Sequence, residues 1–207
     1  MRVVLITFFL QGAALGFTAA AAPGSFQAFV ISQTLAGGWR RAAPIALAPL
    51  ITDGPIILLT QILLGQVPPI FVRGISLVGG LFVIYLAWGL WRGWRAGAGP
   101  ANGGNTATAN GGLWRGVLMN FLSPGPYIFW AFVAGPILLS AWRESPSSAA
   151  SFVLGFYVLM IATLLMVAGL FHQARRLGPM VVRGMLLASI VILVVFAAIL
   201  LRQGVSG

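Results

Sequence analysis

The sequence predicts an all-α membrane protein of six transmembrane helices, arranged as two inverted three-helix repeats whose first helices are broken. Three observations support this fold class. Of the 207 residues, 59% are apolar and 7% are charged, whereas a soluble domain has about a quarter charged residues. Six apolar runs are long enough to cross a bilayer, and a Pro-Gly pair interrupts the first run of each half. Lipid must therefore cover most of the surface.

The six apolar runs are bounded by Arg, Pro or Gly. A bilayer core about 30 Å thick requires about 20 residues of helix, and each run reaches that length. The first run also extends past its Pro-Gly pair to residue 36. The runs cover residues 3–22, 42–64, 70–91, 113–139, 149–171 and 180–201.

Residues 1–22 have a second interpretation, as a signal peptide cleaved at a small-residue site near Ala22. The n-region carries a single Arg, and the most specific motif of the chain follows directly, so a retained membrane helix is favoured.

A stretch rich in Gly, Ala and Asn separates the two halves. Its composition is typical of a flexible linker. The predicted organisation is a first repeat over 1–95, a linker over 96–112 and a second repeat over 113–207.

The arginines predict the orientation. Those that follow the first, third and fifth runs number eight, against four on the other side. Because cytoplasmic loops are enriched in basic residues, both termini are expected outside the cytoplasm. The arginines do not form a basic stripe, so nucleic acid is not an expected partner.

The two halves carry Pro23-Gly24 and Pro124-Gly125 at corresponding places. Proline removes an amide hydrogen and clashes with the preceding turn, so each pair should break its helix. Each half has three spans, so the second copy enters the membrane from the opposite side, which is typical of transporters. The alternative is that Pro and Gly are simply common in membrane helices.

Asp53 lies near the middle of the second run and is one of two acidic residues in the chain. A charge at the bilayer centre costs roughly 2.5–3.5 kcal/mol or more. Asp53 is therefore expected to be protonated or to face a cavity or partner, which suits a proton-coupling group. The alternative is a packing residue that is hydrogen-bonded to Thr52 or to a broken-helix amide.

Other polar side chains in the apolar runs are few. Gln27 and Asn120 lie close to the two breaks and could bind a polar substrate, whereas Gln33 and Gln61 fit contacts between helices. His172 follows the fifth run and has no assigned role.

Five motifs are spread along the chain: Gly12-Ala-Ala-Leu-Gly16, residues 22–33, Gly38-Trp-Arg-Arg41, the Asp53 that ends Leu-Ile-Thr-Asp, and residues 116–125. Together these motifs resemble the LysE/RhtB superfamily of amino-acid exporters, over nearly the whole chain. The resemblance implies a six-span protein of the bacterial cytoplasmic membrane that exports amino acids or related small zwitterions, driven by the proton gradient and assembled as a homodimer.

The expected substrate site contains the two breaks and the polar residues beside them, with Asp53 as the proton-coupling group. Helix amides at the breaks would hold a substrate carboxylate. Two departures from the family pattern leave the substrate open, because Ser25 replaces a proline and Gly125 replaces a lysine. The expected substrate-binding residues are Pro23, Gly24, Ser25, Gln27, Asn120, Ser123, Pro124 and Gly125.

Other functions fit less well. The chain has no Cys and one His, which disfavours related thiol-electron carriers and nickel or cobalt exporters, and no cofactor or metal is expected. An enzyme lacks a nucleophile with its base or a pair of carboxylates. A membrane scaffold or assembly factor remains the alternative, although a broken-helix repeat favours transport.

Overall fold

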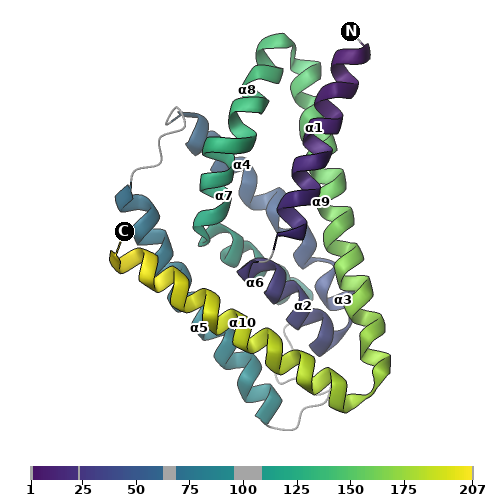
Figure 1. Ribbon diagram of the computed structural model, residues 1–207, viewed down its shortest axis with the longest axis vertical. Helices are drawn as coiled ribbons and strands as arrows, with labels where there is room; N and C mark the ends of the chain where they lie inside the picture. The colour runs from purple at the N-terminus through teal and green to yellow at the C-terminus, as the bar shows by residue number, and fades with distance from the viewer. Residues whose placement is uncertain (1, 23, 63–68, 96–108, 207) are drawn as a thin grey trace.

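The computed structural model describes residues 2–22, 24–62, 69–95 and 109–206 (Figure 1). Within these residues every regular element is a helix. In the described part of the chain, six helices are long and apolar enough to cross a membrane, which confirms the predicted all-α membrane fold. The inverted relation of the two halves stays a prediction. The six membrane-length segments are Arg2–Ala21, Trp39–Gln61, Arg73–Arg92, Pro124–Glu144, Pro146–Leu177 and Pro179–Val205.

The first half begins with a helix that ends where the sequence predicts a break. Gly24 has extended backbone (φ −158°) and precedes a second, shorter helix. Gly38, with φ +81°, ends that helix in a conformation that favours glycine. The predicted run 42–64 starts as two short turns around Pro44 before its main helix. The elements are α1 (Arg2–Ala21), α2 (Ser25–Gly37), α3 (Trp39–Ala42), η1 (Ile45–Leu47), α4 (Ala48–Ile62) and α5 (Pro69–Arg95).

The second half is also broken in its first segment. The run predicted at 113–139 is divided at Ser123, and the membrane-length part starts at Pro124, where the missing amide of proline is tolerated. A π-helical turn follows. The elements are α6 (Ala109–Phe121), α7 (Pro124–Phe129), η2 (Trp130–Ala134), α8 (Gly135–Glu144), α9 (Pro146–Ala174), η3 (Arg175–Leu177) and α10 (Pro179–Ser206).

The predicted linker falls mostly outside the structural description. Residues 96–108 lie outside the described residues, and residues 109–112 form the first turn of α6.

Helix α1 lies along α9 (Figure 1), at a distance that only glycine permits. A Cβ at Gly12 or Gly16 would collide with the backbone of α9, and one at Gly155 would collide with the backbone of α1. Small residues at such contacts are a common way to pack membrane helices. Gly12 and Gly16, four residues apart on α1, thus form a small-residue surface that packs against α9.

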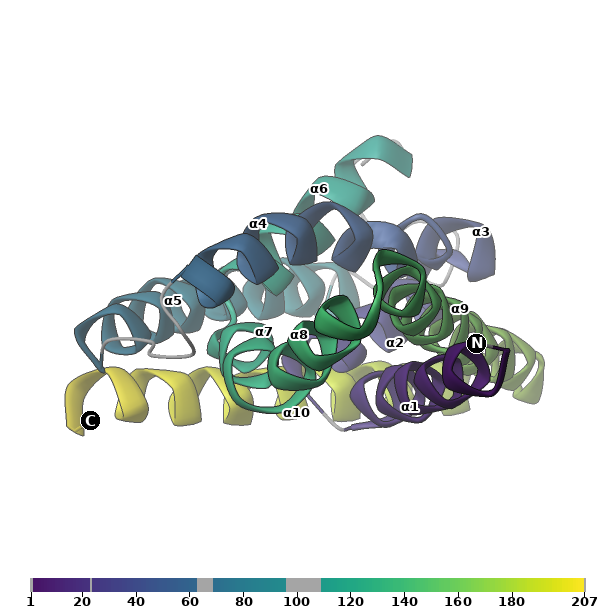
Figure 2. The same ribbon diagram turned by 90° about the horizontal axis from the view of Figure 1, so that it is seen from above.

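Helices α5 and α10 form a second pair, which lies side by side in both views (Figures 1 and 2). Their buried residues, such as Val83 and Leu193, form one apolar cluster with residues of α2. A second cluster joins α7 and η2 to α9 through Tyr127, Trp130 and Phe156. Several residues of this second cluster, among them Trp130 and Phe156, also line an internal cavity.

Candidate functional site

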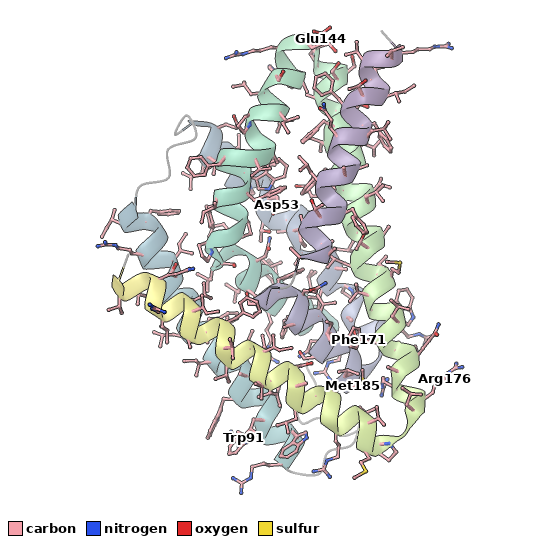
Figure 3. All side chains as sticks on the ribbon, viewed as in Figure 1. Asp53, Trp91, Glu144, Phe171, Arg176 and Met185 are labelled. Carbon is pink, nitrogen blue, oxygen red and sulfur yellow. The ribbon has the colours of Figure 1, made fainter. Side chains whose placement is uncertain are left out.

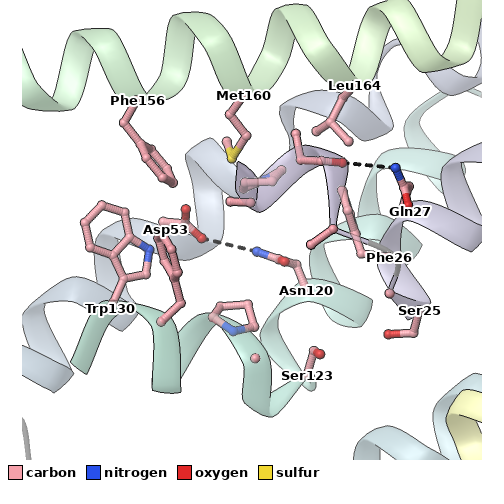
Figure 4. A pocket seen from close by; sticks show the side chains of 18 residues that line it. Ser25, Phe26, Gln27, Asp53, Asn120, Ser123, Trp130, Phe156, Met160 and Leu164 are labelled. Carbon is pink, nitrogen blue, oxygen red and sulfur yellow. Dashed lines mark hydrogen bonds between the residues drawn. The ribbon is translucent and has the colours of Figure 1, made fainter. Parts of the chain in front are cut away.

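A cavity of about 290 Å³ lies between the two broken segments (Figure 4). Residues of α1, α2, α4, α6, α7, η2 and α9 line it, so both halves of the chain contribute. Its walls are mostly apolar, from Phe26 on α2 to Met160 and Leu164 on α9. A cavity of this size, with few polar groups on an apolar wall, is suited to a small ligand.

Seven of the nine residues expected in the site line this cavity. Pro124 is buried at the start of α7 but is not among the lining residues. Pro23 lies outside the described residues. That any of these residues binds substrate stays a prediction. The seven are Gly24, Ser25, Gln27, Asp53, Asn120, Ser123 and Gly125.

Asp53 is 4% exposed. Among the described residues that line the cavity, no other has an ionisable side chain. The side-chain amide of Asn120 donates hydrogen bonds to Oδ1 of Asp53 at 3.2 Å and to the hydroxyl of Thr52 at 2.6 Å. The hydroxyl of Tyr157 donates to Oδ2 at 3.4 Å. The indole ring of Trp130 lies beside the carboxyl group (Figure 4). A buried acid is tolerated when such partners surround it.

The structure agrees only in part with the alternative interpretation, in which Asp53 is a packing residue hydrogen-bonded to Thr52. The hydroxyl of Thr52 does lie 3.4 Å from Oδ1 of Asp53. However, Asp53 also borders the cavity and receives donors from α6 and α9, which lie far from it in the sequence. Asp53 therefore contacts neighbouring helices on one side and faces the cavity on another.

A side chain bridges each of the two helix breaks. The amide nitrogen of Gln27 donates to the carbonyl of Ala20 at 3.1 Å, across the break between α1 and α2. The hydroxyl of Tyr127 donates to the carbonyl of Phe121 at 2.9 Å, across the break between α6 and α7. A helix end leaves its last carbonyls without partners, and these side chains supply one at each break. Gln27 therefore has a structural contact as well as a place at the cavity.

The helices that follow the breaks begin at the cavity. Gly24 precedes α2 and Ser123 precedes α7, and neither cap has a side-chain hydrogen bond. The first amides of a helix lack intrahelical partners and carry a partial positive charge. In α7, Pro124 and Pro126 have no amide hydrogen, so Gly125 supplies the first N–H. Both breaks thus place partial positive charge beside the cavity.

The sequence interpretation missed Tyr157 and Trp130 as neighbours of Asp53. Tyr157 lies 104 positions away, and no local pattern reveals a contact at that separation. A signal did exist for Trp130, because it lies inside its apolar run, away from the ends where membrane tryptophans gather. It is 1% exposed in the structure.

The described helices and this cavity define a multi-pass helical membrane protein with a partly polar internal site. A family model described as LysE type translocator matches residues 17–204, and the chain belongs to this family. The protein is therefore a membrane transporter, in a family of translocators rather than enzymes. No curated protein and no solved structure matched the chain.

Proposed function

We propose that this protein exports amino acids or related small zwitterions across the bacterial cytoplasmic membrane in exchange for protons, with both termini outside the cytoplasm. The observation that carries the proposal is the position of Asp53. It is a buried acid on the wall of a small cavity, between two helix breaks and within hydrogen-bonding distance of Asn120 and Tyr157. Membrane acids of this kind commonly take part in ion or substrate pathways.

The proposed binding mode uses opposite ends of a zwitterion. The substrate carboxylate lies against the free amides at the starts of α2 and α7, where a positive side chain is not needed. The substrate ammonium group lies at Asp53. Apolar parts of the substrate contact Phe26, Phe129 and Met160, which line the same space.

A single carboxylate gives a physical reason for exchange. An unpaired charge in a buried site is strongly unfavourable, so Asp53 must hold either a proton or the ammonium group of the substrate. Binding of one excludes the other. If the proton is taken up from outside and the substrate is released there, the proton gradient drives export.

The test compares Asp53→Asn with Glu144→Gln. Glu144 is the other acid of the chain and lies at the far end of α8, away from Asp53 (Figure 3). Cells that express each form are loaded with amino acids by dipeptide feeding, and amino acids are measured inside and in the medium. Efflux from proteoliposomes is then measured with and without a pH gradient.

We expect the unaltered protein and Glu144→Gln to export one or a few amino acids, faster with the gradient. Asp53→Asn should lose the gradient dependence and most of the export. The proposal fails if Asp53→Asn exports normally with an unchanged response to pH, or if no amino acid moves although the protein reaches the membrane.

A further inference from the structure

Basic side chains gather away from the cavity, where α9 ends and the segment beginning at Trp39 starts. Arg41 lies on α3, His172 lies in the last turn of α9, and Arg175 is the first residue of η3. Arg115 on α6 is near enough to Arg41 to repel its charge. The two acidic residues of the chain are both elsewhere, since Asp53 lines the cavity and Glu144 lies at the opposite end of the molecule from Arg176 (Figure 3). No acidic side chain of the protein therefore neutralises this cluster.

Two consecutive glycines bring these basic groups together. A Cβ at Gly38 would lie 2.6 Å from Nη1 of Arg175 and 3.4 Å from Nδ1 of His172. A Cβ at Gly37 would collide with the side chain of Arg41. Gly38 also has φ +81°, which disfavours other residues. The turn between α2 and α3 thus lets three basic side chains approach one stretch of backbone.

The basic groups have buried nitrogens without partners. Nε of Arg41, Nδ1 of His172 and Nε of Arg175 are all enclosed, and none has a hydrogen-bond partner among the described residues. A buried polar atom without a partner costs about 1–3 kcal/mol, and more when it is charged. Three such atoms in one cluster indicate that a partner from outside the chain belongs there.

We propose that Arg41, His172 and Arg175 form a binding site for a phosphate group, carried by an anionic lipid headgroup or free in solution. Arginine binds phosphate oxygens through paired N–H groups. The cluster lies at the ends of two membrane-length segments, Trp39–Gln61 and Pro146–Leu177, where lipid headgroups meet a protein. A phosphate there supplies both the missing acceptors and the missing negative charge.

This site is separate from the cavity and does not depend on which substrate is transported. An occupied site ties α3 to the end of α9, so its ligand should stabilise the folded protein.

The experiment measures thermal unfolding of the purified protein in detergent. Phosphatidylglycerol, phosphatidylcholine and inorganic phosphate are titrated separately, and native mass spectrometry counts the lipids retained. Arg41→Gln and Arg175→Gln are compared with Arg143→Gln, an exposed arginine of α8 next to Glu144. Loss of one arginine should weaken binding about tenfold or more, from the usual strength of a charged hydrogen bond.

We expect saturable stabilisation by a phosphate-bearing anion that Arg143→Gln keeps and both cluster variants lose. Stabilisation by phosphatidylglycerol alone identifies a lipid headgroup, and equal stabilisation by inorganic phosphate identifies a soluble ion. The proposal is overturned if neither stabilises the unaltered protein beyond phosphatidylcholine, or if the cluster variants respond as Arg143→Gln does. If one cluster variant does not fold, the other cluster variant gives the comparison with Arg143→Gln.

Discussion

The side-chain amide of Asn120 donates a hydrogen bond of 3.2 Å to Oδ1 of Asp53, across 67 positions of sequence. Asn120 belongs to α6, directly before the second break, and Asp53 belongs to α4 in the first half. The contact therefore ties the break of one half to the acid of the other. A movement of α6 relative to α4 would change the surroundings of Asp53.

Asn120→Ala should reduce transport, because it removes donors from both Asp53 and Thr52. The loss of buried hydrogen bonds should cost about 1–3 kcal/mol of stability. Transport is measured in proteoliposomes and stability by unfolding in detergent. Gln173→Ala, at an exposed position of α9, serves as the control. If the double variant with Asp53→Asn lost stability additively, the two residues would not act as a pair.

Tyr127→Phe should destabilise the second break while it keeps the aromatic packing. The substitution removes the hydrogen bond to the carbonyl of Phe121 but leaves the ring contacts with Phe71 and Phe121. The expected cost is about 0.5–1.5 kcal/mol, the net value of a typical hydrogen bond. Tyr85→Phe, on an exposed tyrosine, should leave thermal unfolding unchanged. Equal unfolding temperatures for the two variants would contradict a bridging role.

Gly155→Ala should strongly destabilise the pair of α1 and α9, because its Cβ would collide with the carbonyl of Phe9. The same change at Gly169 on the same helix meets open space and should be neutral or stabilising by about 0.5–1 kcal/mol, since alanine favours helix. Unfolding in detergent measures both. A tolerated Gly155→Ala would show that α1 and α9 are not packed this closely.

Met160→Ala should change which substrates are carried, because Met160 lines the cavity and is 5% exposed. The shortened side chain enlarges the site, so larger amino acids should gain relative to smaller ones. Competition assays in proteoliposomes measure this preference. Met166→Ala, on the same helix but 55% exposed, should keep the original preference. An unchanged preference in Met160→Ala would place the substrate elsewhere.

Much of the fold was accessible from the sequence. The all-α class and the number of membrane-length helices follow from apolar runs, because a bilayer demands about 20 apolar residues for each crossing. The breaks were also visible, since proline removes a backbone donor wherever it occurs. The boundaries were less accurate in the second half, where the run 113–139 continues to Glu144 and its membrane-length part begins at Pro124.

The sequence by itself determined that this protein crosses a membrane with six helices, that two of its segments are broken, and that Asp53 is an acid within an apolar run. These properties depend on composition and local chemistry. Only the tertiary structure decided that Asn120, Trp130 and Tyr157 surround Asp53, and that His172 and Arg175 lie against Gly38 while Arg41 lies against the neighbouring Gly37. Those groups come from different helices, and they meet because the packing of α1 on α9 and the turns at the breaks fix where each helix lies.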